Sequence, residues 1–291
     1  MKFKNQKGQA VLIVLLSLSV VLVVSLFVVS RSITDISLST KEGDSLRAFS
    51  AAEAGIERAL VVGDSAGNLG NASFGADVSD FAKGANKIVY PLALRSGEYA
   101  TFWFSRGTSD NQFAGNIVDI CWGAWGTVRN LATTPALEFT LYYNPDTADL
   151  NNLTKIKIAR VMLDPNNTRV NDNHFSILNS TNDIHTCEIN GEQFEFHKSF
   201  YIGGQLVTNY GTPGVLKYVT VRMLYNTDTN HKVGLDLSGN TGANSILPSQ
   251  GNLIESVGSS SDSNRKIEVY ELFPVIPPIF NNALFSTSDI Q

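Results

Sequence analysis

The residues that could bind a metal or form a covalent link are few in this chain. Its only two cysteines, Cys121 and Cys187, lie far apart in the sequence, and they are either joined in one disulfide or buried as two separate thiols. His185 stands two positions before Cys187, which invites comparison with a zinc site. Zinc ligands come in closely spaced pairs, however, and no second pair is present. We therefore predict no metal site and leave both alternatives for the cysteines open.

Two polar segments and one aromatic segment are the remaining candidates for ligand binding. The segments DPNNT (164–168) and NTDTN (226–230) carry oxygen ligands of the kind that calcium prefers, but neither has the glycine and final glutamate of an EF-hand loop. The segment CWGAWG (121–126) suits a ligand platform or, more commonly, a core tryptophan beside a tight turn. No catalytic or nucleotide-binding motif occurs. The sequence therefore predicts no catalytic residue, no cofactor and no enzyme activity.

The bulk composition favours a folded protein that does not bind nucleic acid. Of the 291 residues, 43% are hydrophobic, which is enough to build a sizeable core, and the net charge is −5. An acidic surface exerts no long-range attraction on nucleic acid, and no run of Lys and Arg suggests a local basic patch. We expect no nucleic-acid partner.

The N-terminal segment has the features of a membrane anchor. No charge occurs from Ala10 to Val29, and sixteen of these twenty residues are Val, Leu, Ile or Phe. A bilayer crossing needs ~20 such residues, and their insertion is favourable by about 5–10 kcal/mol in sum. Three lysines precede the segment and the first acid is Asp35. The positive-inside rule therefore places the N-terminus in the cytoplasm and the rest of the chain outside, in a single pass.

A cleaved secretory signal is the main rival to this anchor. The apolar core of such a signal is usually about 7–15 residues long and ends in a small-x-small cleavage site. Here the core is longer and is followed by Ser30-Arg31-Ser32, which is a poor match to that site. We therefore expect the apolar segment to stay in the mature protein.

The helix is expected to continue beyond the membrane. No proline interrupts residues 9–62, and Gly63 is suited to cap a helix C-terminus. Apolar or small residues recur every three or four positions, as on one face of a helix. They are Ile33, Ile36, Thr40, Gly43, Leu46, Phe49, Ala52, Ile56 and Ala59. We predict one helix ~80 Å long, with Leu46, Phe49, Ala52 and Ile56 packed on a sheet.

Strand patterns dominate the chain after residue 63. Segments that alternate in polarity or are rich in β-branched and aromatic residues occur at 138–143, 155–161, 193–202, 216–225 and 265–273. Together with the N-terminal helix, they predict an α+β fold. In this fold a long N-terminal α-helix, transmembrane and then amphipathic, packs on a mainly antiparallel β-sheet head.

Finer details of the head can also be predicted. Residues 88–94 and 98–104 are expected to form a hairpin through a short turn, and residues 63–87 a connecting loop with room for a short strand. In the segment 155–161, Ile156, Ile158 and Val161 should face a core. The proline-containing segment 274–286 should cover a sheet edge.

The N-terminal features together resemble those of a type IV pilin-like protein with a class III signal. The segments GQAVLIVLLSLSVVLVVSLFVVSRS (8–32) and RAFSAAEAGIERAL (47–60) are similar to the N-terminal region of PilX-type minor pilins. The strand–loop–strand pattern at 253–273 adds a less specific resemblance. The resemblance implies a leader peptide at 1–8, a transmembrane and amphipathic pilin helix at 9–62, and an extracytoplasmic β-rich head at 63–291.

The resemblance also implies a processing step and a set of partners. Prepilin peptidase would cut between Gly8 and Gln9 and leave the apolar segment as membrane anchor, and later as filament core. The implied partners are other pilin subunits, the peptidase, an inner-membrane assembly platform and membrane lipid. The implied location is the cytoplasmic membrane and then the pilus or the cell surface.

One departure from the family pattern bears on the position of the subunit. Most major pilins carry Glu as the fifth residue of the mature chain, where this chain has Ile13. PilX-like minor pilins and GspK-like pseudopilins also lack this acid, which favours a place in the tip or priming complex. The alternative function is an unprocessed, single-pass surface binding protein. An exported enzyme is a third class, which no catalytic motif supports.

Overall fold

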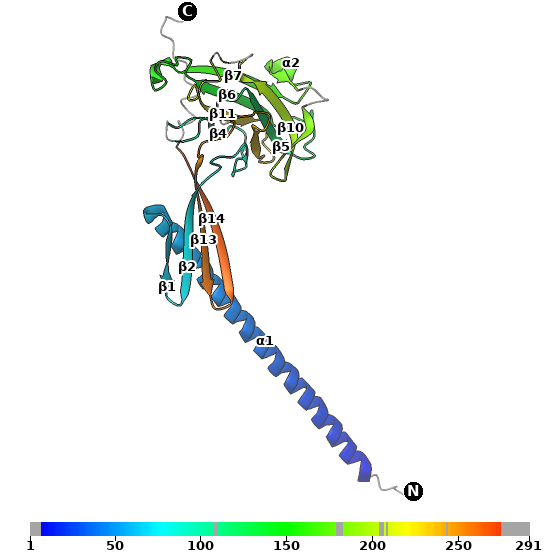
Figure 1. Cartoon of the computed structure of the whole chain (residues 1–291). Helices are drawn as coiled ribbons and strands as arrows, with labels where there is room; N and C mark the ends of the chain where they lie inside the picture. The colour runs from blue at the N-terminus through cyan, green and yellow to red at the C-terminus, as the bar shows by residue number, and fades with distance from the viewer. Residues whose placement is uncertain are drawn as a thin grey trace, which may run out of the picture. The chain divides into compact units, whose positions relative to one another are not determined.

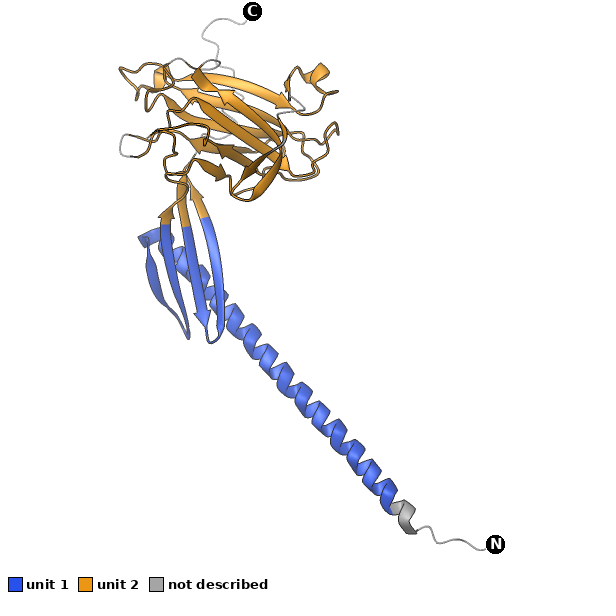
Figure 2. Cartoon of the chain, turned by 45° about the vertical axis from the view of Figure 1, so that its right-hand side comes forward, with its two compact units in different colours: residues 1–78, 254–269 blue, residues 79–253, 270–291 orange. Residues whose placement is uncertain are grey.

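The computed structural model describes residues 7–107, 110–178, 183–203, 207, 209–242 and 244–274 (Figure 1). The chain forms two compact units, which Figure 2 colours separately. Residues 1–78 and 254–269 make the first unit, and residues 79–253 and 270–291 make the second. The predicted fold class is confirmed, because a long N-terminal helix packs on strands and the rest of the described chain is mainly antiparallel sheet.

The first unit combines the helix with a four-stranded sheet. Helix α1 (Lys7–Val62) ends as predicted at Gly63, which has a φ of 82° and donates its amide hydrogen to the Ala59 carbonyl at 2.9 Å. The sheet has the order β1-β2-β13-β14. Its strands are β1 (Ser65–Leu69), β2 (Ala72–Asp80), β13 (Gly251–Ser260) and β14 (Ser263–Leu272).

The segment 63–87 is more ordered than the predicted loop. Strands β1 and β2 pair antiparallel in it, in a hairpin whose last pair is Leu69 with Ala72. Alternate residues of β2, beginning with Ala72, Phe74 and Ala76, are buried. Gly and Ala have low β-propensity, so the residue types of this segment do not predict strands. The strands are instead stabilised by the packing of the helix on their buried face.

Small residues bring the helix backbone close to the sheet. Ala48, Ala51 and Ala52 are fully buried. A side chain on Gly258 of β13 would overlap the carbonyl oxygen of Ala48 and the amide nitrogen of Ala52. Since Gly258 has no side chain, the helix and the strand can meet backbone against backbone.

The buried face of the helix differs in part from the predicted stripe. Ala52 and Ile56 are buried as predicted, but Leu46 and Phe49 are 64% and 44% exposed, so their predicted burial is wrong. Where the helix approaches Gly258, it presents the small, fully buried side chains of Ala48 and Ala52. The buried face is therefore turned toward Ala48 and away from Leu46 and Phe49.

Replacement of Gly258 by alanine should loosen the helix from its sheet. The added carbon meets the backbone of Ala48, which cannot rotate away as a side chain can, and overpacking of this kind costs about 1–3 kcal/mol. Hydrogen exchange at the amides of residues 45–60, in the full chain in detergent, measures the effect. Gly75→Ala in β2 is the matched control, since no atom lies within 4 Å of the added carbon. Equal protection in the two variants would contradict this packing.

The second unit contains two five-stranded sheets. One has the order β3-β12-β5-β10-β9, and the other β4-β11-β6-β7-β8. The strands of the first are β3 (Lys87–Val89), β12 (Val233–Asp236), β5 (Ile117–Ala124), β10 (Glu192–Tyr201) and β9 (Ile184–Ile189). Those of the second are β4 (Tyr99–Trp103), β11 (Leu216–Leu224), β6 (Ala136–Tyr143), β7 (Lys157–Asp164) and β8 (Ser176–Ile177). A 3₁₀ turn, η1 (Leu153–Lys155), and a short helix, α2 (Val170–Asn173), lie in the connections.

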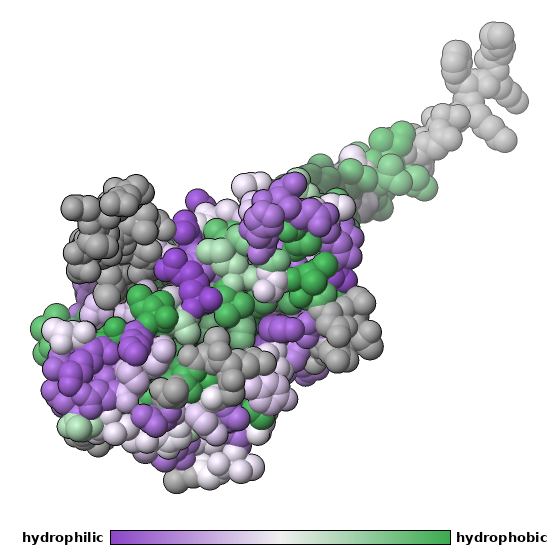
Figure 3. All heavy atoms as spheres, turned by 90° about the horizontal axis from the view of Figure 1, so that it is seen from above, coloured by the Kyte–Doolittle hydropathy of each residue, from purple (hydrophilic) through white to green (hydrophobic). Residues whose placement is uncertain are grey.

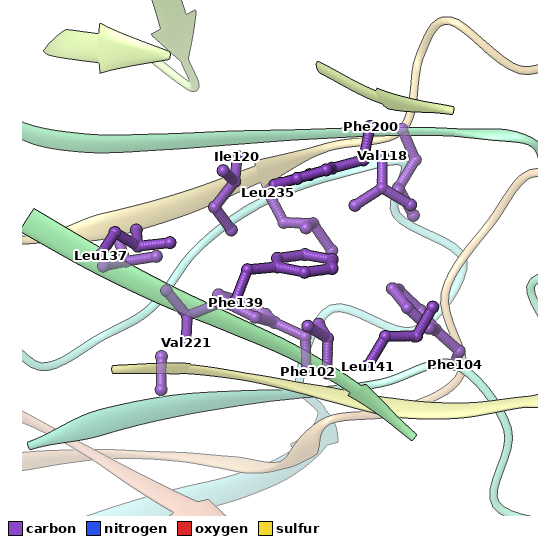
Figure 4. Close-up of a cluster of buried hydrophobic side chains, with 14 of the residues drawn as sticks. Phe102, Phe104, Val118, Ile120, Leu137, Phe139, Leu141, Phe200, Val221 and Leu235 are labelled. Carbon is purple, nitrogen blue, oxygen red and sulfur yellow. The ribbon is translucent and has the colours of Figure 1, made fainter. Parts of the chain in front are cut away.

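The core of the second unit lies between these two sheets. Phe139 of β6 stacks on Phe200 of β10 with ring centroids 4.2 Å apart. Figure 4 shows the two rings among apolar side chains that come from both sheets. Because alternate residues of strands from both sheets, such as β5 and β10 in one and β4, β6 and β11 in the other, point into this one cluster, the unit is a β-sandwich.

Two of the finer predictions for the head are wrong. The segments 88–94 and 98–104 do not form a hairpin, since β3 pairs with β12 and β4 pairs with β11 in the other sheet. Pro91 has no amide hydrogen for a strand ladder, and β3 ends before it. Ile158 is 54% exposed, while Val161 packs against the core as predicted. Three positions separate these two residues, so they lie on opposite faces of β7.

Candidate functional site: the apolar helix and an aromatic face of the sandwich

The first candidate site is the N-terminal part of α1. Each large apolar side chain of residues 11–29 is at least 55% exposed, and no residue of this stretch is buried by the part of the chain that the structure describes. Figure 3 shows this end of the helix as mainly hydrophobic. The stretch is long and apolar enough to cross a membrane.

The polar groups of this stretch are partly satisfied within the helix. Ser17 donates its hydroxyl hydrogen to the Val14 carbonyl at 2.9 Å, and Ser19 donates to the Leu16 carbonyl at 2.8 Å. A hydroxyl that bonds its own helix costs less to place in lipid than a free one. These serines are therefore compatible with an apolar surrounding.

The predicted cleavage positions, Gly8 and Gln9, and Ile13, the position at which most major pilins carry Glu, lie at the start of the same helix. The backbone of Gly8 and Gln9 is helical, and the side chain of Gln9 lies outside the described residues. Ile13 is 64% exposed on the helix surface, among other aliphatic side chains. An acid at that position would need a partner from another molecule, and Ile13 needs none.

The two cysteines form a disulfide in the structure. Cys121 of β5 and Cys187 of β9 are bonded with a Cα–Cα distance of 6.2 Å, and both strands pair with β10. The Cys187 sulfur is therefore not available as a zinc thiolate, and the side chain of His185 lies outside the described residues. Among the residues that the structure describes, no three His, Cys, Asp or Glu side chains are grouped to hold a metal.

Structural contacts occupy the polar segments that resembled calcium ligands. Asp164 is fully buried, and its two carboxylate oxygens accept from Arg169 at 2.7 and 2.8 Å. In the second segment, Asn226 donates to the carbonyls of Leu94 and Thr229 at 2.9 and 3.0 Å. Both segments organise loops through their own side chains.

The two tryptophans of CWGAWG have different environments. Trp122 is fully buried and donates its Nε1 hydrogen to the Pro135 carbonyl at 2.9 Å, as expected for a core residue. Trp125 is half exposed and lines a hollow of about 310 Å³ with His231. The Nδ1 atom of His231 accepts from the Ala124 amide at 3.1 Å, and burial lowers the pKa of His231. His231 is thus a neutral structural side chain at neutral pH.

The second candidate site is a row of side chains across one sheet of the sandwich. Trp103, Tyr218, Tyr142 and Ile158 are register neighbours on β4, β11, β6 and β7. The Tyr142 and Tyr218 rings stack with centroids 4.4 Å apart, and the Trp103 and Tyr218 centroids are 4.9 Å apart. We call these four residues the aromatic row.

The aromatic row forms the floor of a groove of about 460 Å³. Leu153, Ile156, Lys217 and Pro274 also line it. Burial raises the pKa of Tyr218 to about 12, and burial also lowers the pKa of Lys217. The groove therefore favours an apolar ligand with few charges. Sequence reasoning missed this site because its members come from four separate segments.

The comparisons with known proteins return no relative. No family model matches the chain, no curated protein is detectably similar to it, and no solved structure matches it. Arguments about function therefore rest on the chain's own residues and geometry.

Proposed function

We propose that the chain is a minor pilin or pseudopilin, a structural subunit of a type IV pilus-like filament. The observation that carries this proposal is the two-part helix α1. Its first part exposes a continuous apolar surface over residues 11–29, and its later part buries Ala48, Ala51 and Ala52 against the sheet of the first unit. A helix built in this way can be held first in lipid and then among the apolar helices of a filament, while it carries a folded head.

The proposal includes processing between Gly8 and Gln9. The basic leader and the glycine at the border of the apolar run support it. A mature chain that starts at Gln9 keeps the whole apolar stretch as its anchor. In this topology the N-terminus lies on the cytoplasmic side of the cytoplasmic membrane and the rest of the chain lies outside.

The N-terminal sequence of the membrane-extracted protein tests this function. In a cell that contains a prepilin peptidase, we expect the mature chain to begin at Gln9. The variant Gly8→Asp should retain Met1, because a charged side chain does not fit a site built for glycine. A wild-type chain that keeps Met1 would favour the alternative, an unprocessed surface binding protein with the same anchor.

The isoleucine at position 13 supports a place at or near the filament tip. In the family, the glutamate of an incoming subunit pairs with the N-terminal amine of the subunit on its tip side. A subunit with Ile13 needs no such neighbour, while its own amine can still receive the glutamate of the next subunit. Immunogold labelling of sheared filaments should therefore mark one end. Even labelling along the filaments would show that Ile13 is incidental to position.

A further inference from the structure

The described chain ends at the aromatic row. Pro274, its last residue, lines the groove. The preceding Phe273 is fixed, since its amide donates to the Gln250 carbonyl at 3.3 Å and the Arg106 guanidinium lies 3.1 Å from its ring centroid. The same guanidinium lies 5.7 Å from the Trp103 ring centroid. Residues 273 and 274 therefore lie at the Trp103 end of the row.

The sequence that continues from this point suits an aromatic groove. Residues 274–280 are PVIPPIF, with no charged side chain. Prolines 274 and 277 are three apart, which is the repeat of a polyproline II helix. Aromatic-lined grooves bind such helices because proline rings pack on aromatic faces and the segment loses little entropy.

The lengths of the segment and of the row agree. The row crosses four strands, so its ends are about 14 Å apart at the usual strand spacing. In a polyproline II helix the four rises from residue 274 to residue 278 span about 12 Å, and a fifth rise to residue 279 brings the span to about 15 Å. A segment whose residue 274 lies at Trp103 therefore brings residues 278 and 279 to the Ile158 end of the row.

The far end of the groove has apolar surface to be covered. Leu153 is 78% exposed and Ile158 is 54% exposed. Ile158 lies on β7, the strand next to Tyr142 on the side away from Trp103, and Leu153 lies in the 3₁₀ turn just before β7 and also lines the groove. Covering such side chains is favourable by roughly 25 cal/mol per Å² of apolar surface.

We propose that the aromatic row is the docking site of the chain's own segment 274–280, bound in cis as a polyproline II helix. The segment enters at Trp103, crosses Tyr218 and Tyr142, and ends over Ile158. This contact fixes the C-terminal part of the chain on the sandwich, and it is independent of the proposed role in a filament.

Cysteine cross-linking in the full chain in detergent tests the proposal. The variant Ile158→Cys/Pro278→Cys should form an intramolecular disulfide under mild oxidation, identified by mass spectrometry of non-reduced peptides. The matched control is Val128→Cys/Pro278→Cys, because Val128 is 58% exposed on the same unit but does not line the groove. We expect the first pair to cross-link at least tenfold faster than the control.

The other outcomes of this experiment overturn the proposal. Equal rates in the two variants would show that the segment does not dock on the row. A cross-linked dimer from the first pair, in place of the intramolecular product, would show that the groove takes the segment of a second copy.

Discussion

Replacement of Asp164 by alanine should lower the free energy of unfolding of the second unit by about 3–5 kcal/mol, as expected when one member of a buried ion pair is removed. The Asp164 side chain is completely buried, and that of Arg169 is 13% exposed. Arg169 also donates to the Thr134 carbonyl at 2.7 Å and lies 3.8 Å from the Tyr225 ring centroid. Without the carboxylate, the guanidinium stays in this buried place with its charge unpaired.

A surface ion pair of the same unit gives the control for this experiment. Asp80 and Lys83 lie 2.9 Å apart, with side chains that are 46% and 47% exposed. Exposed pairs of this kind contribute about 0–1 kcal/mol, so Asp80→Ala should change stability little. Urea unfolding, followed by the fluorescence of the full chain, compares the two variants. Similar decreases in the free energy of unfolding for Asp164→Ala and Asp80→Ala would contradict the structural role of Asp164.

Removal of the disulfide should lower the free energy of unfolding of the second unit by about 4 kcal/mol. The bond closes a loop between residues 66 positions apart, and the chain-entropy model gives this magnitude for a loop of such length. Cys121 and Cys187 pack with Ile189 and Phe194 in one apolar cluster. The double variant Cys121→Ala/Cys187→Ala keeps the cluster apolar, and it removes the link together with the two buried sulfur atoms.

Reduction of the wild-type protein provides the matching measurement. The reduced wild type and the double alanine variant should unfold at similar urea concentrations, and both below the oxidised wild type. If the oxidised and the reduced wild type unfold at the same urea concentration, the disulfide does not stabilise the protein by the amount that its loop length implies.

The burial of the helix shows where sequence patterns stop being informative. Apolar spacing along α1 predicts a helix and a buried face, but large side chains such as Leu46 and Phe49 dominate that pattern. Which face is buried depends on Gly258, about 200 residues further along the sequence. Because Gly258 has no side chain, the backbone of Ala48 and Ala52 can approach it closely. A tertiary contact therefore overrides the local apolar pattern.

The sequence alone determined the features that arise from local interactions. The helix observed over Lys7–Val62 agrees closely with the predicted range 9–62, because composition, helical period and the cap at Gly63 all act within a few residues. The strands at 136–143, 192–201 and 216–224 were likewise visible from their residue types. The α+β fold class followed from these elements.

The tertiary structure decided which segments meet. Strand pairing places Trp103, Tyr142, Tyr218 and Ile158 in one row and joins Cys121 to Cys187, although each segment looks the same from sequence whichever partner it has. Register matters because a shift of one residue turns every side chain to the other face of a strand. Ile158 and Val161 were predicted to share the core face, but pairing places Val161 beside the buried Phe139 and Ile158 beside Tyr142, so Ile158 faces the groove. Non-local pairing, which no local pattern encodes, is what creates the candidate binding site.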